Sequence, residues 1–374
     1  MRVLVFGGSF DPPHRGHLEL LRAAAERLRP ERIVVLPAYH APLKGAASAP
    51  ARDRLAMVRL GLVEALPPRL RKLAVIDAEE VNAARRVYTH ESLRRFAGDR
   101  VDFVVGQDSA ASFSRWKRPA DLKRLATWWY GRRPGAGGGV PSFFRVVPGR
   151  FRDVSSTELR SALALGRARA KDLVPAVLEH IRSRKLYGLD RLAVLERTLP
   201  PGRYEHTLNV ASLAESLARR WGADPEKART AGLLHDAGRR FPPPALASYV
   251  RRRRLKVPER ERLLRQDPML LHAYVSEDLA RREFGVEDRE TLDAVRRHTL
   301  GDARLSLLDK VLYVADASSA DRTHDGVEKT RALAFEDLDE ALRRCVAEKL
   351  AHALEREAWL HPLTVRLWNS LAAL

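Results

Sequence analysis

Two histidines, His14 and His17, lie at the end of a glycine-rich turn that begins at Gly7 and Gly8. The apolar run Val3–Phe6 precedes this turn, and a helical pattern follows it. Glycine lets a ligand approach the main chain without a Cβ in the way, and the first N–H groups of a helix attract anions. Imidazole donors at that position would stabilise charge on a phosphoryl group during its transfer. Because these residue types gather within eleven positions, we expect a phosphate-binding loop rather than an ordinary strand-to-helix turn.

The second half of the chain carries a different set of residues whose types could support a reaction. His235 and Asp236 form an adjacent pair at the end of an apolar helical pattern, and Asp316 lies inside an apolar run. A carboxylate is costly to bury there unless it is paired or binds a metal. Taken singly, each histidine is more typical of a core or surface residue, but the set favours a hydrolytic metal centre with two ions that share a carboxylate such as Asp236. The expected ligands are His206, His235, Asp236, His272, His298 and Asp316, whereas His324, His352 and His361 are expected to be structural.

The elements that must position the first set alternate between strand-like and helix-like patterns. Such alternation predicts an α/β fold, a Rossmann-like doubly wound parallel sheet with ligands at the carboxyl ends of its strands. The expected helices include 18–28, 53–64 and 89–96. The expected strands are 3–6, 33–36, 73–76, 101–105, 127–130 and 144–147.

From about residue 172 onward, helical periodicity replaces the alternation and predicts an all-α domain. The expected helices are 174–186, 193–198, 204–221, 225–235, 270–284, 291–298, 305–317 and 338–358. Gly188 can end a helix, so we place the boundary near residues 187–190. The predicted domains are therefore 1–187 and 191–374.

Composition restricts the class of protein. The 374 residues include 67 Lys and Arg against 48 Asp and Glu, a net charge of +19, which favours anionic partners such as nucleotides. The basic residues are spread along the chain, so nucleic acid is not a required partner. The apolar runs are far too short for a membrane span. The single cysteine, Cys345, suits a reducing cytoplasm, and a homo-oligomer is compatible with the sequence.

The segment Gly7–His17 resembles the signature of the nucleotidylyltransferases that use an HxGH motif. Val154–Arg160 resembles their second phosphate-binding motif, at a helix N-terminus. Further matches between these segments and up to residue 187 point to one branch, the bacterial nicotinate mononucleotide adenylyltransferases. They are Pro42-Leu43-Lys44, Arg54, Met57, Tyr88-Thr89, Leu93, Gly106-Gln107-Asp108, Phe113, Trp116-Lys117 and Asp172-Leu173-Val174-Pro175.

This resemblance implies that the phosphate of nicotinate mononucleotide attacks the α-phosphate of ATP in line, giving deamido-NAD and pyrophosphate with Mg²⁺ bound to the phosphates. It implies that His14 and His17 stabilise the transition state and that Lys44 meets phosphate. Further residues are implied to bind nucleotide. They are Gly7, Gly8, Ser9 and Phe10 in the loop, Gly106 and Asp108 at ribose, Tyr88, Thr89 and Trp116 on the nicotinate side, and Ser155, Ser156, Thr157 and Arg160 at the β- and γ-phosphates.

The second half resembles the HD phosphohydrolase superfamily, whose defining element is the pair His235-Asp236. Arg203–Thr207, Ala231–Asp236 and Arg297–Thr299 are similar to one branch, the symmetrical diadenosine tetraphosphate hydrolases, as is the run that ends at Asp316. The resemblance implies hydrolysis of diadenosine tetraphosphate to two ADP at a two-metal, iron-containing centre. It also implies that Thr299, Asp321 and Arg322 lie near the polyphosphate, while Arg239 stands where Lys is common, which leaves its role in substrate binding open.

We therefore predict a bifunctional enzyme whose ligands are ATP, nicotinate mononucleotide and diadenosine tetraphosphate. Two alternatives remain at this point. The same folds could act on another adenylyl acceptor and another nucleotide, or the helical half could sense a nucleotide and regulate the transferase.

Overall fold

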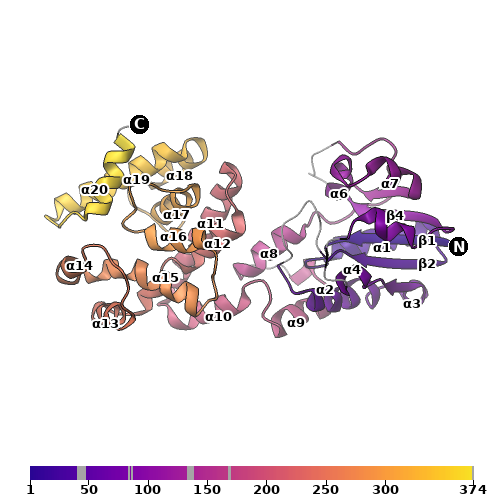
Figure 1. Cartoon of the computed structure of the whole chain (residues 1–374), viewed down its shortest axis with the longest axis horizontal. Coiled ribbons are helices and arrows are strands. Elements are labelled where there is room, and N and C mark those ends of the chain that lie inside the picture. Colours follow the sequence, from indigo (N-terminus) through magenta and orange to yellow (C-terminus); the bar gives the residue numbers. More distant parts are fainter. Residues whose placement is uncertain (40–47, 83–84, 86, 133–138, 167–169, 373–374) are drawn as a thin grey trace. The chain divides into compact units, whose positions relative to one another are not determined.

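The computed structural model describes residues 1–374 except 40–47, 83–84, 86, 133–138, 167–169 and 373–374 (Figure 1). The chain forms two compact units, Met1–Asp190 and Arg191–Leu374. Among the described residues, no helix is long and apolar enough to cross a membrane.

Unit 1 is built on one sheet of six parallel strands in the order β3-β2-β1-β4-β5-β6. The chain runs from β1 outward through β2 to β3, and then returns to place β4 on the other side of β1. Loops that leave neighbouring strands in opposite directions open a crevice at the carboxyl ends of those strands. The strands are β1 (Arg2–Gly8), β2 (Arg32–Pro37), β3 (Ala74–Ile76), β4 (Arg100–Gly106), β5 (Thr127–Gly131) and β6 (Arg145–Val147).

Strand β1 is apolar at successive positions because both faces of the sheet are covered. Leu4 and Phe6 pack on one face with the helix that follows β1. Val3 and Val5 pack on the other face, in a cluster that includes Phe103. The predicted doubly wound sheet is confirmed, and each of the six predicted strands is present.

Helices connect the strands of unit 1 and cover both faces of the sheet. A π-helical turn, Arg59–Val63, continues α2. The α-helices are α1 (Arg15–Leu28), α2 (Ala51–Val58), α3 (Pro68–Arg71), α4 (Glu79–Asn82), α5 (Thr89–Arg94), α6 (Gln107–Ala111), α7 (Pro119–Leu125), α8 (Ser156–Ala164) and α9 (Pro175–Ser183).

Unit 2 is helical throughout its described residues, as predicted. Helix α17 lies at its centre and packs against α11, α12, α16, α18 and α19. The α-helices are α10 (Leu189–Thr198, which begins two residues before the unit), α11 (Pro201–Trp221), α12 (Pro225–Leu234), α13 (Pro243–Arg253), α14 (Arg260–Gln266), α15 (His272–Arg282), α16 (Arg289–Arg297), α17 (Leu307–Ser318), α18 (Val327–Glu336), α19 (Leu338–Glu355) and α20 (Pro362–Ala372). Two 3₁₀ turns, η4 (Ala237–Arg240) and η5 (Pro268–Leu271), complete the unit.

Four of these helices, α13, α14, α18 and α20, are absent from the sequence prediction. Helix α13 shows the reason, because it buries only Leu246 and Val250, one turn apart, while its last three residues are arginines. Two apolar positions do not make a recognisable helical period.

Helices α11 and α12 approach each other closely at Gly232. A Cβ built on this residue would lie 2.5 Å from the Cα of Ala211 and 2.8 Å from its backbone nitrogen. Those contacts are with main-chain atoms, which cannot rotate away. Glycine is therefore required three residues before His235.

We expect Gly232→Ala to lower the free energy of unfolding of unit 2 by about 1–3 kcal/mol, because the added methyl group overpacks the contact. The matched control is Gly202→Ala in the same helix pair, where a Cβ meets nothing within 4 Å. Calorimetric unfolding of the two full-length variants measures the difference. Equal stability of both variants would contradict the close approach.

Two candidate functional sites

The phosphate-loop histidines are held by the N-terminal end of α1. His14 is the residue that caps this helix, and its Nδ1 accepts the backbone N–H of His17 at 3.3 Å. In return, Nδ1 of His17 accepts the backbone N–H of His14 at 3.3 Å, and the two rings stack with centroids 3.6 Å apart. Because each Nδ1 accepts a hydrogen bond, each neutral ring carries its proton on Nε2. The pair therefore presents N–H donors beside a helix N-terminus, which suits an anion.

The glycines that precede these histidines leave room for two rings. A Cβ on Gly7 would lie 2.8 Å from the ring of Phe103, and one on Gly8 would lie 2.8 Å from the ring of Phe10. Phe10 is buried in the core, and its ring meets the His17 imidazole edge-on at 5.2 Å. The structure thus places Phe10 beneath the loop, where it positions His17.

Arg54 of α2 binds the main chain of the loop and of the segment that follows β2. Its guanidinium is 2% exposed and donates to the carbonyls of Ser9 (3.0 Å), Ala38 (2.6 Å) and Tyr39 (2.9 Å). Burial lowers the pKa of Arg54 while Asp11 opposes that shift. We predicted no role for Arg54 from the sequence, because its partners are backbone carbonyls that leave no pattern.

Asp11 ties the same loop to two distant segments. Its carboxylate accepts the backbone N–H groups of Ser48 (2.7 Å) and Ala49 (3.1 Å) and the hydroxyl of Tyr187 (2.8 Å). Burial, reinforced by the charge of Asp11, raises the pKa of Tyr187 well above its usual range, so this hydroxyl keeps its proton. The loop conformation therefore depends on the last residues of unit 1.

Helix α8 brings the second predicted motif onto the loop. Ser155 caps the helix by accepting the backbone N–H of Glu158. The hydroxyl of Ser156 donates to the carbonyl of Pro12 at 2.8 Å, and Arg160 donates to the carbonyl of Asp11 at 2.8 Å and to Thr157 Oγ1 at 3.4 Å. The N-termini of α1 and α8 therefore lie on the same loop.

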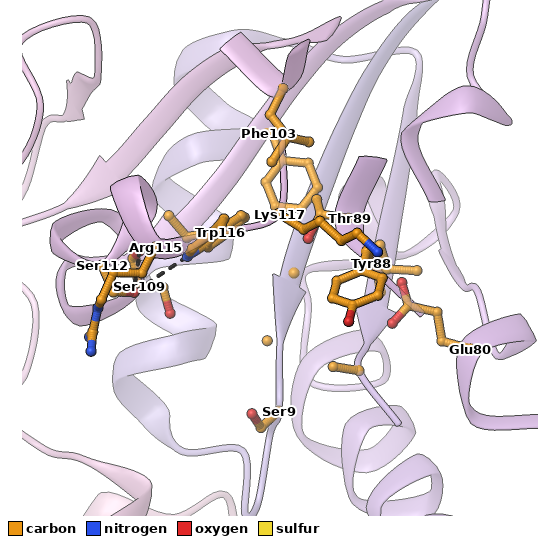
Figure 2. Close-up of a pocket in the computed structure, with 16 residues that line it drawn as sticks. Ser9, Glu80, Tyr88, Thr89, Phe103, Ser109, Ser112, Arg115, Trp116 and Lys117 are labelled. Atoms are coloured by element: carbon orange, nitrogen blue, oxygen red, sulfur yellow. Dashed lines mark hydrogen bonds between the residues drawn. The ribbon is translucent and has the colours of Figure 1, made fainter. Parts of the chain in front are cut away.

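A cavity of about 380 Å³ lies at the carboxyl ends of β1 and β4 (Figure 2). Six of its lining residues are sequence-predicted: Gly7, Gly8, Ser9, Tyr88, Thr89 and Trp116. The labelled rings of Tyr88 and Trp116 stand on opposite sides of this cavity. The lining set excludes Phe10, His14, His17, Gly106, Asp108 and the α8 residues. Of these, Gly106 ends β4 beside open space and Asp108 is exposed in α6, while Lys44 lies outside the described residues.

Charged residues for which no site role was predicted also line the cavity. Lys117 holds its ammonium 4.2 Å from the centre of the Tyr88 ring, and Arg115 lies in the adjacent turn. Glu80 faces the cavity from α4 and accepts the hydroxyl of Ser92, and burial raises the pKa of its carboxyl group. The cavity thus combines aromatic walls with two cations, which suits an anionic aromatic ligand.

In unit 2, three imidazoles are held by the C-terminal ends of short helices. His235 follows α12, His272 follows η5 and His298 follows α16. Each Nδ1 lies 2.7 Å from the carbonyl oxygen three residues earlier, at Gly232, Met269 and Val295. Because Nδ1–H donates to that carbonyl, each Nε2 keeps its lone pair, which is the state that binds a metal.

These lone pairs converge. Nε2 of His272 lies 3.1 Å from Nε2 of His298, and the hydroxyl of Thr299 lies within 3.1 Å of both nitrogens. One hydroxyl proton can bond to only one of them. Nε2 of His235 is buried and has no hydrogen-bond partner. Buried acceptors that face one another without donors indicate the position of a cation.

Two carboxylates complete this cluster. Oδ1 of Asp236 lies 3.2 Å from Nε2 of His272, and its Oδ2 lies 3.6 Å from Nε2 of His235. Asp316 Oδ1 lies 3.0 Å from Nε2 of His206 and 3.7 Å from that of His235. Two sets of ligand atoms result, His206–His235–Asp316 and His235–Asp236–His298, and within each set the atoms lie within 4.8 Å of one another. All six predicted ligands therefore meet in one place.

Burial and charge set the protonation of these groups. Burial lowers the pKa of His235, and it lowers that of His298 well below the usual range, reinforced by the neighbouring imidazoles. For Asp236 and Asp316, burial opposes ionisation, but nearby histidines and arginines outweigh it and hold both pKa values well below their usual range. These four groups are thus in the form that binds a metal.

His206 differs because both of its ring nitrogens meet carboxylates. Nδ1 lies 2.7 Å from Asp321 and Nε2 lies 3.0 Å from Asp316. Burial alone would lower the pKa of His206, but the hydrogen bonds to the two carboxylates raise it. The structure thus places Asp321 on the far side of His206, where it orients the ring.

Three guanidinium groups surround the carboxylates. Arg203 and Arg239 donate to Asp236 at 2.9 and 3.0 Å, and Arg322 donates to Asp316 at 2.8 Å. We predicted a site role for Arg239 and Arg322 but none for Arg203. Its position one turn before His206 on α11 could have indicated it, since residues three apart share a helix face.

The chain matches two family descriptions. Residues 5–162 match the Cytidylyltransferase-like family, and residues 203–321 match the HD domain family. Three relatives illustrate the relation.

A protein of Mycoplasma genitalium named "Probable nicotinate-nucleotide adenylyltransferase/Ap4A hydrolase" is 26% identical over 87% of this chain and 89% of its own length. The "Bis(5'-nucleosyl)-tetraphosphatase, symmetrical" of Bacillus subtilis is 35% identical over 49% of this chain and 97% of its own length. A "Probable nicotinate-nucleotide adenylyltransferase" of Laribacter hongkongensis is 36% identical over 49% of this chain and 93% of its own length.

The buried imidazole of His298 predicts a pH dependence of unit 2 in metal-free protein. The unfolded chain binds a proton on this ring near pH 6.5, whereas the folded chain, with its lowered pKa, does not. The unfolded state therefore binds more protons as the pH falls, and stability is lost below about pH 6.5. Replacing His298 by Gln should reduce the loss of unfolding free energy between pH 7 and pH 5 by up to about 2 kcal/mol.

Chemical unfolding at both pH values, with a chelator present, measures this difference. The exposed His324→Gln is the control and should keep the pH dependence of the unsubstituted chain. An unchanged pH dependence in His298→Gln would refute the lowered pKa.

Proposed function

We propose a bifunctional enzyme, on the premise that this chain belongs to the nicotinate-nucleotide adenylyltransferase family through its first half and to the symmetrical bis(5′-nucleosyl)-tetraphosphatase family through its second. It transfers AMP from ATP to nicotinate mononucleotide and hydrolyses diadenosine tetraphosphate (Ap4A) to two ADP. The observation that carries this proposal is the presence of both families on one chain, in the order found in a relative that aligns over nearly its whole length. The membership confirms both resemblances predicted from the motifs.

In the transfer reaction, a phosphate oxygen of nicotinate mononucleotide forms a bond to the α-phosphorus of ATP. The bond from that phosphorus to the bridging oxygen breaks, and pyrophosphate leaves. Such a reaction needs positioning and charge stabilisation rather than a protein nucleophile. His14 and His17 supply Nε2–H donors at the N-terminus of α1, and α8 supplies a second helix N-terminus. Mg²⁺ enters with ATP and neutralises phosphate charge.

The acceptor occupies the cavity between Tyr88 and Trp116. Its pyridine ring packs against these aromatic side chains, and its carboxylate is attracted by the cations of Lys117 and Arg115. The support for this assignment is the chemistry of the lining, which combines stacking surfaces with positive charge.

In the hydrolytic reaction, the HD centre binds divalent metal ions through His206, His235, Asp236, His272, His298 and Asp316. The ions, when bound, supply Lewis-acid activation of water and of the phosphate oxygens. Arg203, Arg239 and Arg322 lie around the centre and offset the negative charge of the tetraphosphate. Asp321 holds the ring of His206 in the orientation that its Nε2 needs.

We propose iron for these ions, because four imidazoles and two carboxylates form the mixed nitrogen and oxygen set that first-row transition metals accept. We also propose a cytoplasmic location. It rests on the single, buried cysteine of the chain, which suits a reducing compartment.

We expect His17→Ala to lower deamido-NAD formation by about a hundredfold or more, since a transition-state donor is lost. Hydrolysis of Ap4A by the same protein should stay within twofold. His17→Asn separates capping from catalysis, because the amide oxygen can accept the N–H of His14 while the Nε2–H donor is gone. Product chromatography measures both activities. Loss of both in a folded protein would contradict separate sites, and full activity of His17→Asn would show that His17 only accepts the N–H of His14.

The reciprocal variant is Asp236→Ala, which removes the carboxylate whose two oxygens face His272 and His235. Bound metal and Ap4A hydrolysis should fall to background, while deamido-NAD formation is retained. Elemental analysis and the two assays measure these outcomes, with the exposed Asp325→Ala as control. Metal content equal to that of the unsubstituted chain would argue against this site.

A further inference from the structure

Lys349 of α19 lies beside the metal cluster but beyond residues 203–321, the part that matches the HD family. Its ammonium donates to the backbone carbonyl of Thr299 and lies 5.4 Å from the centre of the Tyr313 ring. The hydroxyl of the same Thr299 contacts Nε2 of both His272 and His298. The ammonium is therefore held by a residue, Thr299, whose hydroxyl contacts two of the proposed metal-ligand imidazoles.

Lys349 differs from the arginines around the cluster, because no carboxylate of the described residues forms an ion pair with it. Arg203, Arg239 and Arg322 each pair with a carboxylate of the cluster. For Lys349, the described part of the chain offers no carboxylate within ion-pair distance, and the charges of Asp316, which favours the ammonium, and of Arg239 and Arg322, which oppose it, act on it from further away. Burial lowers the pKa of Lys349 to about 8. A cation that is partly removed from water without an ion-pair partner is costly, so its presence at this position needs another explanation.

We infer that Lys349 binds the substrate polyphosphate, with its ammonium on a phosphoryl oxygen of the chain held across the metal centre. This inference rests on the proposed hydrolysis of a dinucleoside tetraphosphate. The tetraphosphate supplies the missing anion, and Thr299 fixes the ammonium next to the ions that bind the same phosphates. Lys349 thus adds a cation to the arginines that pair with Asp236 and Asp316.

The competing explanation is structural, because the bond from Lys349 to the carbonyl of Thr299 also holds the segment that carries His298. Lys349→Gln separates the two roles. The glutamine amide keeps a donor for that carbonyl but removes the positive charge. Lys349→Arg keeps the charge. The matched control is Lys310→Gln on α17. The ammonium of Lys310 lies 2.6 Å from the carboxylate of Asp339, which is not one of the six proposed metal ligands.

The experiment uses the full-length, metal-loaded chain and measures three quantities for each variant. They are kcat and KM for Ap4A, the dissociation constant of inorganic tripolyphosphate by calorimetry, and the metal content. We expect Lys349→Gln to raise KM and to weaken tripolyphosphate binding, each about tenfold. Its metal content should be unchanged, and its kcat should fall by a smaller factor than the factor by which KM rises. Lys349→Arg should recover most of this loss, and Lys310→Gln should match the unsubstituted chain.

Two results would overturn the inference. One is a KM and a tripolyphosphate affinity of Lys349→Gln within twofold of the unsubstituted chain. The other is a joint loss of metal and affinity in Lys349→Gln that Lys349→Arg does not recover, which would assign the residue a structural role. If the unsubstituted chain did not hydrolyse Ap4A, the proposed function would fail, but tripolyphosphate binding would still decide whether Lys349 meets a polyphosphate.

Discussion

The polarity of a helix end decides what its neighbouring histidine can bind, and both sites depend on this constraint. At the N-terminus of α1, backbone N–H groups donate to Nδ1 of His14 and His17, so each Nε2 becomes a donor. At the C-terminal ends of α12 and α16, backbone carbonyls accept from Nδ1 of His235 and His298, so each Nε2 keeps the lone pair that a metal ion requires. The same type of side chain thereby suits an anion in unit 1 and a cation in unit 2.

Buried charges enforce this arrangement in both units. In unit 1, Arg54 donates to backbone carbonyls, among them that of Ser9 in the loop, and Asp11 ties the loop to the backbone N–H of Ala49. In unit 2, Asp236 and Asp316 stay ionised because arginines and imidazoles surround them.

The sequence was sufficient where a pattern is local. Apolar runs such as 3–6 predicted the strands, and the adjacent pair His235-Asp236 with its scattered partners predicted a metal cluster. It was insufficient where partners are distant or are main-chain atoms. Arg54 and Lys349 look like ordinary basic residues of helices, because the carbonyls they bind leave no trace in the sequence. Helix α13 was missed because arginines dominate its last turn.

The central claim is that one chain carries two independent nucleotide activities. Mass spectrometry of the products of the purified, full-length chain tests it most directly, with ATP and nicotinate mononucleotide in one reaction and Ap4A alone in another. We expect deamido-NAD and pyrophosphate in the first reaction and ADP as the sole nucleotide product in the second. Absence of deamido-NAD from the first, or formation of AMP and ATP in the second, would contradict it.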